Sequence, residues 1–140
     1  MMKGLLSSGD IVENYLYLWR RQALAGETEG RKFRPVCLAL AVVDAKKLTH
    51  LALLPISGQQ PAVSQRALEL PPLEIRRIGF ATGKPLWLYV SEYNYDILEK
   101  SFYIEPEPGP RPRLSANFMK KVLLEFRATL LEPEARVDRR

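Results

Sequence analysis

Cysteine and histidine are almost absent from this chain of 140 residues, which contains one of each, Cys37 and His50. A single cysteine cannot form an internal disulfide, which is typical of a protein kept in a reducing compartment. A metal site made of imidazole and thiolate ligands needs more of these residues than the chain has. We therefore expect no metal site of this kind. No cofactor is expected either.

Long apolar runs are also lacking. No stretch approaches the roughly 20 residues that a helix needs to cross a bilayer. Residues 1–8 contain only two consecutive large apolar residues, too few for the apolar centre of a secretory signal. The sequence therefore predicts a cytoplasmic protein that does not associate with membranes.

The lone cysteine lies inside an apolar stretch. The favoured interpretation of Cys37 is a buried thiol that packs as a small apolar group. The alternative is a cysteine nucleophile with His50 as its base, since a hairpin would bring the two residues near each other. A thiol-alkylating probe separates the two, because a buried thiol reacts only after denaturation.

Composition is that of one globular domain over residues 1–140, with 46% hydrophobic and 26% charged residues. Lys and Arg number 21 against 16 Asp and Glu, a net charge of +5. An excess of this sign favours an anionic partner but does not identify it.

The most informative stretch is residues 30–57. Two apolar runs, one at 36–43 and one that ends at Ser57, are separated by a short charged turn, which predicts a β-hairpin. In an antiparallel pair the start of one strand lies beside the end of the other, so Arg34 and Ser57 are expected at the same end of the sheet. A guanidinium and a hydroxyl side by side can bind one phosphate. The alternative for Arg34 is a surface residue beside a strand.

Several short elements surround this hairpin. Strands are predicted at 9–19, 65–70, 85–90 and 102–104. A short helix is predicted from Pro71 to Gly79, with proline in its first turn and glycine just past its end. Residues 20–33 are expected to form a long loop. Residues 105–113 contain four prolines and are expected to be a semi-rigid connector.

A C-terminal helix is the clearest local prediction. Ser115 can cap its start and Pro133 marks its end. Apolar residues recur every four positions, at Phe118, Val122, Phe126 and Leu130. This apolar stripe either packs on the sheet or forms a partner-binding or dimer face.

Together these elements predict a mainly β fold. Several short strands with one terminal helix indicate a small, strongly curved antiparallel sheet or barrel, with a short mid-chain helix and a C-terminal α-helix appended. Residues 132–140 are expected to be a flexible tail.

Four segments together resemble the MazF/PemK family of toxin endoribonucleases, which belong to toxin–antitoxin pairs. Residues 9–12 are similar to the family's opening Gly-Asp-Ile/Leu strand, and residues 30–36 to its Gly-x-x-Arg-Pro-Val strand. Residues 54–57 are similar to its Val-Pro-Ile-Thr segment, and the C-terminal helix falls where the family has one. The resemblance is best over 9–57 and 115–131.

The resemblance implies an SH3-like barrel over residues 9–131 and a homodimer. It also implies metal-independent cleavage of single-stranded RNA, in which the ribose 2′-OH attacks its own phosphate and leaves a 2′,3′-cyclic phosphate and a 5′-OH. A cognate antitoxin protein is the second partner that the resemblance implies.

The same resemblance assigns roles to individual residues. Arg34 takes the place of the family's arginine that neutralises the phosphorane and donates a proton to the leaving oxygen. Ser57 takes the place of the threonine that hydrogen-bonds the phosphate, and keeps its hydroxyl. We also expect Arg31, Lys32 and Phe33 to contact RNA, through charge and through stacking on a base.

One segment departs from the family. Some members carry Arg-x-Asp-Gln-x-Arg where this chain has Tyr-Val-Ser-Glu-Tyr-Asn at 89–94. Glu92 is a candidate general base for the 2′-OH, and Asn94 a candidate hydrogen-bonding group for RNA. The alternative for Glu92 is a solvated charge at a strand end. The missing charges also leave open a second function, a catalytically inactive SH3-like module that binds nucleic acid or protein.

Overall fold

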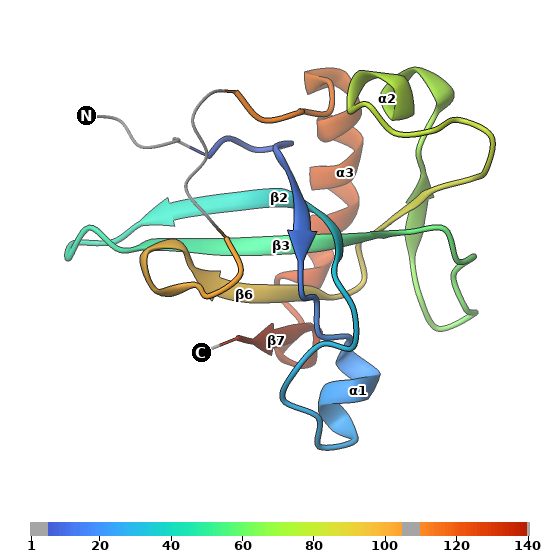
Figure 1. Ribbon diagram of the computed structural model, residues 1–140. Coiled ribbons are helices and arrows are strands. Elements are labelled where there is room, and N and C mark those ends of the chain that lie inside the picture. Colours follow the sequence, from blue (N-terminus) through green and yellow to red (C-terminus); the bar gives the residue numbers. More distant parts are fainter. Residues whose placement is uncertain (1–5, 105–109, 140) are drawn as a thin grey trace.

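A computed structural model describes residues 6–104 and 110–139 (Figure 1). The described residues form a mainly β structure, with seven strands in one sheet. The strands are β1 (Ile11–Tyr15), β2 (Arg34–Val43), β3 (Thr49–Ser57), β4 (Ala67–Glu69), β5 (Trp87–Tyr89), β6 (Tyr93–Ile97) and β7 (Arg136–Asp138). The α-helices are α1 (Arg20–Leu24), α2 (Pro72–Arg77) and α3 (Ala116–Thr129). The expected connector at 105–113 lies largely outside the described residues.

The β2–β3 hairpin is the centre of the sheet, as predicted. Its register pairs Val36 with Pro55 at one end and Val43 with Thr49 beside the turn. Along its length β3 changes partner, because its first half pairs with β6 and its last two residues pair with β5. The hairpin therefore links all the remaining strands of the sheet to one another. Its two ends face different parts of the molecule (Figure 1).

The sheet does not close into the expected barrel. Its strand order is β1-β2-β3-β5-β4, with β6 and β7 branching from β3, and within the described ranges β1 and β4 are not paired. Strands β4 and β5 have three residues each, or about 10 Å of chain, too short to curve round to β1. The result is an open, mostly antiparallel sheet in which only β6 and β7 run parallel.

Helix α3 covers the back of this sheet (Figure 1). The Ser115 Oγ accepts a hydrogen bond from the Phe118 backbone N–H at 3.1 Å, which caps the helix as predicted. Phe118, Val122 and Phe126 are buried in one core with Leu54 of β3. The apolar stripe thus packs on the sheet, and only its last member, Leu130, is largely exposed.

The front of the sheet is covered by the chain that follows β1. Tyr15, Tyr17 and Trp19 pack there in a second core with Leu38 and Leu53. Strand β1 ends at Tyr15, earlier than the predicted strand 9–19, and the predicted loop 20–33 begins with helix α1. The sheet is therefore buried on both faces.

Two further expectations at the C-terminal side are wrong. Residues 102–104 form no strand. The segment expected to be a flexible tail contains the short 3₁₀ helix Pro133–Ala135 and strand β7, whose Val137 is buried. Strand β7 has one apolar residue among charged ones, which gives almost no strand signal in the sequence. Its pairing partner is β6, about 40 residues earlier in the chain, and nothing local indicates that contact.

The predicted short helix is present as α2, followed by Gly79 with φ +82°. No helix in the described parts of the chain combines the length and the apolar character that a membrane span requires.

Candidate functional site

Arg34 and Ser57 lie together where β2 begins and β3 ends. Continuing the register of Val36 with Pro55 by two residues places Arg34 opposite Ser57, on one face of the sheet. Both residues line a surface hollow of about 580 Å³, which we call the strand-end hollow. Lys32, Phe33, Phe80 and Leu86 also line it. The volume is in the range of small-molecule binding sites.

Arg34 is a cation that forms an ion pair with no carboxylate in the described parts of the chain. Its side chain is half-buried, and within the described residues its guanidinium forms no ion pair and no hydrogen bond. The Nε atom is fully buried without an acceptor. Burial lowers the pKa of Arg34, because desolvation disfavours the charged form. A partly desolvated charge of this kind gains most from an anion that reaches it.

An aromatic residue holds this cation in place. The Arg34 Cζ lies 5.2 Å from the centre of the Trp19 ring, and the Arg21 Cζ lies 5.9 Å from the same ring. Tyr17 and Tyr89 pack edge-on against Trp19 with centroid distances of 5.2 and 5.1 Å. The indole is therefore fixed by its neighbours, and it positions two guanidinium groups at one end of the sheet.

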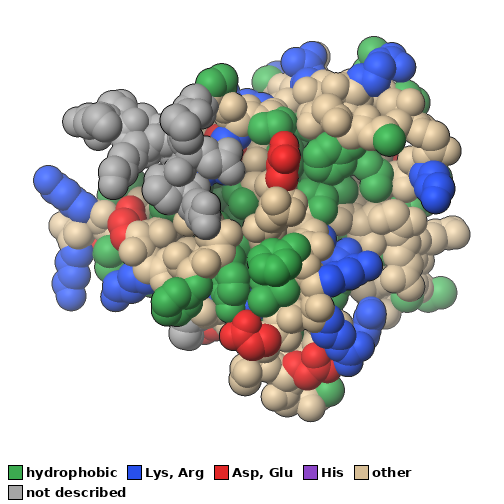
Figure 2. Space-filling model, in the orientation of Figure 1, with side chains coloured by type: hydrophobic (Ala, Val, Ile, Leu, Met, Phe, Trp, Pro, Cys, Tyr) green, Lys and Arg blue, Asp and Glu red, His purple; other side chains and the backbone are tan. Residues whose placement is uncertain are grey.

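The residues just before β2 divide into two groups. Lys32 is exposed and Phe33 is 60% exposed, and both line the strand-end hollow. Arg31 does not line it, and its guanidinium binds both carboxylate oxygens of Glu27 at 3.0 and 2.6 Å. Figure 2 shows Lys and Arg side chains gathered just above α1 on this side of the molecule. The local charge that can attract an anion thus comes from Arg21, Lys32 and Arg34.

The hydroxyl of Ser57 is oriented by the loop that follows β3. Its Oγ accepts a hydrogen bond from the Gln59 backbone N–H at 3.1 Å. The Tyr89 hydroxyl donates to the Gln59 carbonyl and fixes the same loop. No acceptor for the Ser57 hydroxyl proton is found in the described residues, so this proton can be donated to a ligand.

Glu92 does not belong to this hollow. It is 5% exposed, and its Oε2 accepts hydrogen bonds from the Tyr17 hydroxyl at 3.1 Å and from the Arg20 backbone N–H at 2.8 Å. Burial raises the pKa of Glu92, while these hydrogen bonds oppose the shift. The alternative of a solvated charge is therefore wrong, and the carboxylate instead binds the start of α1 to the turn that precedes β6.

Asn94 is a buried structural residue rather than a surface group. Its side chain is 0% exposed, its Oδ1 accepts from the Leu18 N–H at 2.9 Å, and its Nδ2 donates to the Leu18 carbonyl at 2.7 Å. These two hydrogen bonds satisfy the backbone N–H and carbonyl of Leu18, which lies outside any strand. The expectation that Asn94 contacts RNA does not fit this placement.

The alternative of a cysteine nucleophile is also wrong. Cys37 is fully buried opposite Leu54, and burial raises the pKa of its thiol. His50 lies near the hairpin turn, opposite Val42, and binds Asp44 and Tyr95 instead. The pairing of thiol and imidazole that this alternative requires is therefore not formed, and the favoured interpretation of Cys37 as a buried thiol fits its position. Among residues 6–104 and 110–139, no group of three or more His, Cys, Asp or Glu side chains is arranged to hold a metal ion.

Arg21 and Tyr89 were not predicted from the sequence to belong to the site. A signal for Arg21 was present, because Trp-Arg-Arg at 19–21 places cations directly after an aromatic residue. Because residues 20–33 were predicted to be a loop, this signal was not used to place Arg21. The edge-on contact of Tyr89 with Trp19 joins residues 70 positions apart, and nothing local indicates it.

The chain matches no protein-family model, no curated protein and no solved structure.

Proposed function

We propose that the protein binds single-stranded RNA at the strand-end hollow and cleaves it without a metal ion, as the resemblance to MazF/PemK toxins implies. The observation that carries this proposal is the half-buried guanidinium of Arg34, which has no carboxylate partner in the described chain and lines the same hollow as Ser57. A phosphodiester supplies the missing negative charge and accepts hydrogen bonds from both groups.

In the proposed reaction, the 2′-oxygen of a ribose forms a bond to its own phosphorus and the bond from phosphorus to the 5′-oxygen breaks. Arg34 neutralises the charge that develops on the phosphoryl oxygens, and Ser57 donates a hydrogen bond to one of them. The 2′-OH proton passes to water, and Arg34 donates a proton to the departing 5′-oxygen and recovers one from solvent.

The walls of the hollow suit the rest of a nucleotide. Phe33 is largely exposed, and Phe80 and Leu86 add apolar surface on which an unpaired base can stack. Lys32 and Arg21 lie where they attract neighbouring phosphates. Unpaired bases can reach such a surface, whereas bases inside a duplex cannot, and this favours single-stranded RNA as the substrate.

The wider parts of the proposal come from the resemblance. We infer that the protein is a cytoplasmic toxin that acts as a homodimer and is bound by an antitoxin. Its fold would be SH3-like, with a sheet that does not close into a barrel. Support comes from the positions of the resembling segments, since residues 9–12, 30–36 and 54–57 lead into or lie in β1, β2 and β3, which are neighbours in the sheet.

A second function is favoured by a separate observation. Among the residues that the structure describes, no carboxylate lines the strand-end hollow. Glu92, the expected general base, and Asn94, the expected hydrogen-bonding group for RNA, are buried and bound to protein groups. A hollow with a cation and a hydroxyl but no general base can bind RNA and release it uncut. The alternative is therefore a non-catalytic module that binds single-stranded RNA.

One assay separates these functions. The protein and Arg34→Ala are incubated with single-stranded RNA of mixed sequence in EDTA, with Arg31→Ala as the matched control because Arg31 is already paired with Glu27. Fragments with 2′,3′-cyclic phosphate ends, lost only in Arg34→Ala, support the nuclease. Binding without fragments, again dependent on Arg34, supports the module. If the folded protein neither cleaves nor binds the RNA, both proposed functions are wrong.

A further inference from the structure

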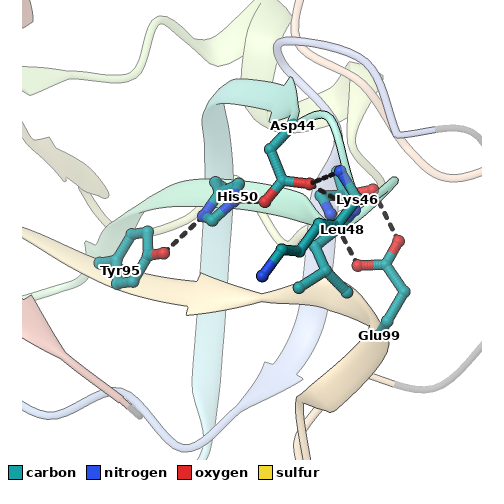
Figure 3. A network of polar contacts seen from close by, with 7 residues as sticks. Asp44, Lys46, Leu48, His50, Tyr95 and Glu99 are labelled. Atoms are coloured by element: carbon teal, nitrogen blue, oxygen red, sulfur yellow. Dashed lines mark hydrogen bonds and ion pairs between the residues drawn. The ribbon is translucent and has the colours of Figure 1, made fainter.

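A second polar site lies at the opposite end of the hairpin, around its turn. The Asp44 Oδ2 is 2.7 Å from the His50 Nε2, and the His50 Nδ1 is in short hydrogen-bond contact with the Tyr95 hydroxyl. Figure 3 shows these residues in one line, from the turn across β3 to β6. A carboxylate, an imidazole and a hydroxyl in this order form the arrangement of an activated nucleophile.

The carboxylate is fixed before it meets the imidazole. The Asp44 Oδ1 accepts hydrogen bonds from the backbone N–H groups of Lys46 and Leu48, at 2.8 and 3.0 Å, which leaves Oδ2 for His50. The hydrogen bond from His50 is the largest of the contacts that hold the pKa of Asp44 below its usual range. An ionised Asp44 orients the imidazole with its proton on Nε2, so that Nδ1 accepts from the Tyr95 hydroxyl.

A cation lies over the phenol ring. The Arg136 Cζ is 3.8 Å from the centre of the Tyr95 ring, and its Nε is bound to Asp138 in the same strand. A guanidinium over an aromatic face is attracted more strongly as that ring gains negative charge. Arg136 is therefore placed to stabilise negative charge that develops on Tyr95 during a reaction.

We propose that Tyr95 is a nucleophile and a covalent modification site for activated acyl compounds. In the step, the Tyr95 oxygen forms a bond to the acyl carbon and the bond from that carbon to the leaving group breaks, with its electron pair going to the leaving group. The phenol proton passes to His50 Nδ1 and then to the leaving group. The product is an acyl-tyrosine ester.

Tyr103 offers a matched comparison inside the same chain. It is also partly exposed, its hydroxyl donates to the Glu29 Oε2 at 2.8 Å, and the Arg139 Cζ lies 4.8 Å from its ring centre. Both phenols thus have an acceptor and a cation over the ring. Only Tyr95 has an imidazole backed by a carboxylate, so a difference in reactivity between the two reports the contribution of His50 and Asp44.

Access also favours Tyr95. Tyr15, Tyr17, Tyr89 and Tyr93 are buried, whereas Tyr95 is partly exposed and about 31% of the His50 side chain faces solvent. The structural alternative is that the three groups only attach the hairpin turn to β6. That role requires the hydrogen bonds but no reactivity of the phenol.

The test is acylation of the whole protein by N-acetylimidazole at pH 7.5, with the rate at each tyrosine followed by peptide mass spectrometry. Tyr95 is expected to react at least tenfold faster than Tyr103. In His50→Gln, which keeps an acceptor near Tyr95 but has no basic nitrogen, its rate is expected to fall to that of Tyr103. Asp44→Asn is expected to give an intermediate rate.

The rate at Tyr103 serves as the internal control for folding, since local unfolding would change it as well. Equal rates at Tyr95 and Tyr103 in the unchanged protein would overturn the proposal. So would a Tyr95 rate that stays high in His50→Gln while the variant remains folded by circular dichroism. Either result would leave the three residues a structural attachment of the turn.

Discussion

The two ends of the β2–β3 hairpin differ in how their charges are paired. At the turn, Asp44 binds His50, and Glu99 accepts from both the backbone and the hydroxyl of Thr49. At the other end, about 30 Å away along the ten residues of β2, Arg34 has only the Trp19 ring for a partner in the described chain. The turn also carries Lys46 and Lys47, which are exposed and form no ion pair in the described chain. The difference between the two ends is therefore the half-buried cation of Arg34, which gains more from an anion than an exposed lysine does.

The largest expected effect comes from removing the unpaired cation. Arg34→Ala is expected to lower the rate of RNA cleavage by about 100-fold or more, since a positioned donor to a developing oxyanion contributes this much. Arg34→Lys keeps the charge but not the two-pronged geometry and is expected to recover part of the rate. Arg31→Ala should change the rate less than twofold. Equal losses in both alanine variants, measured by gel assay, would remove the distinction between paired and unpaired arginines.

A large effect on stability is expected at Asn94. Asn94→Ala leaves the Leu18 N–H and carbonyl without partners and opens a small cavity, at a cost of about 2–4 kcal/mol in the free energy of unfolding. Urea denaturation measures this loss. The folded fraction should bind RNA as well as the unchanged protein does. Normal stability with weakened RNA binding would instead place Asn94 at the RNA.

A smaller effect is expected at Ser57. Ser57→Ala removes one hydrogen bond to the phosphate and the acceptor for Gln59, and is expected to lower the cleavage rate about tenfold. Ser57→Thr keeps the hydroxyl and should remain within a few-fold of the unchanged protein. Single-turnover kinetics test both. A Ser57→Ala rate equal to that of the unchanged protein would show that the phosphate does not contact this residue.

The smallest effect concerns the pH dependence of stability at Glu92. Because burial raises the pKa of Glu92 in the folded state above its ordinary 4.5, its contribution is full below that value and is lost as pH rises through the folded pKa. Glu92→Gln does not titrate and keeps an oxygen acceptor for Tyr17 and Arg20. The variant should therefore gain stability relative to the unchanged protein as pH rises from 4.5. Denaturation curves whose difference stays constant with pH would contradict this.

Local signals in the sequence predicted the elements that local contacts stabilise. The hairpin, the capped helix α3 and the proline-started helix α2 depend on residues within a few positions of one another. The meeting of Arg34 and Ser57 followed from the hairpin register alone. The position of these two residues at one end of the hairpin could therefore be predicted from the sequence.

Long-range contacts decided what the sequence could not show. Asn94 binds Leu18 and Glu92 binds Arg20 across more than 70 residues, so the same polar residues that suggested catalysis serve the packing of the chain after β1. The open sheet has a similar origin, because closure depends on how far β4 and β5 extend. Burial, which decides between these roles, is a property of the whole fold.

The central claim is that the unpaired Arg34 holds an RNA phosphate, and the most direct test is equilibrium binding of a labelled single-stranded oligonucleotide with 2′-O-methyl groups, which cannot be cleaved. Fluorescence anisotropy at several salt concentrations gives the affinity and the slope of log K against log salt. We predict that Arg34→Ala weakens binding at least tenfold and reduces the slope by about one, while Arg31→Ala leaves both nearly unchanged. Unchanged affinity and slope in folded Arg34→Ala would contradict the account.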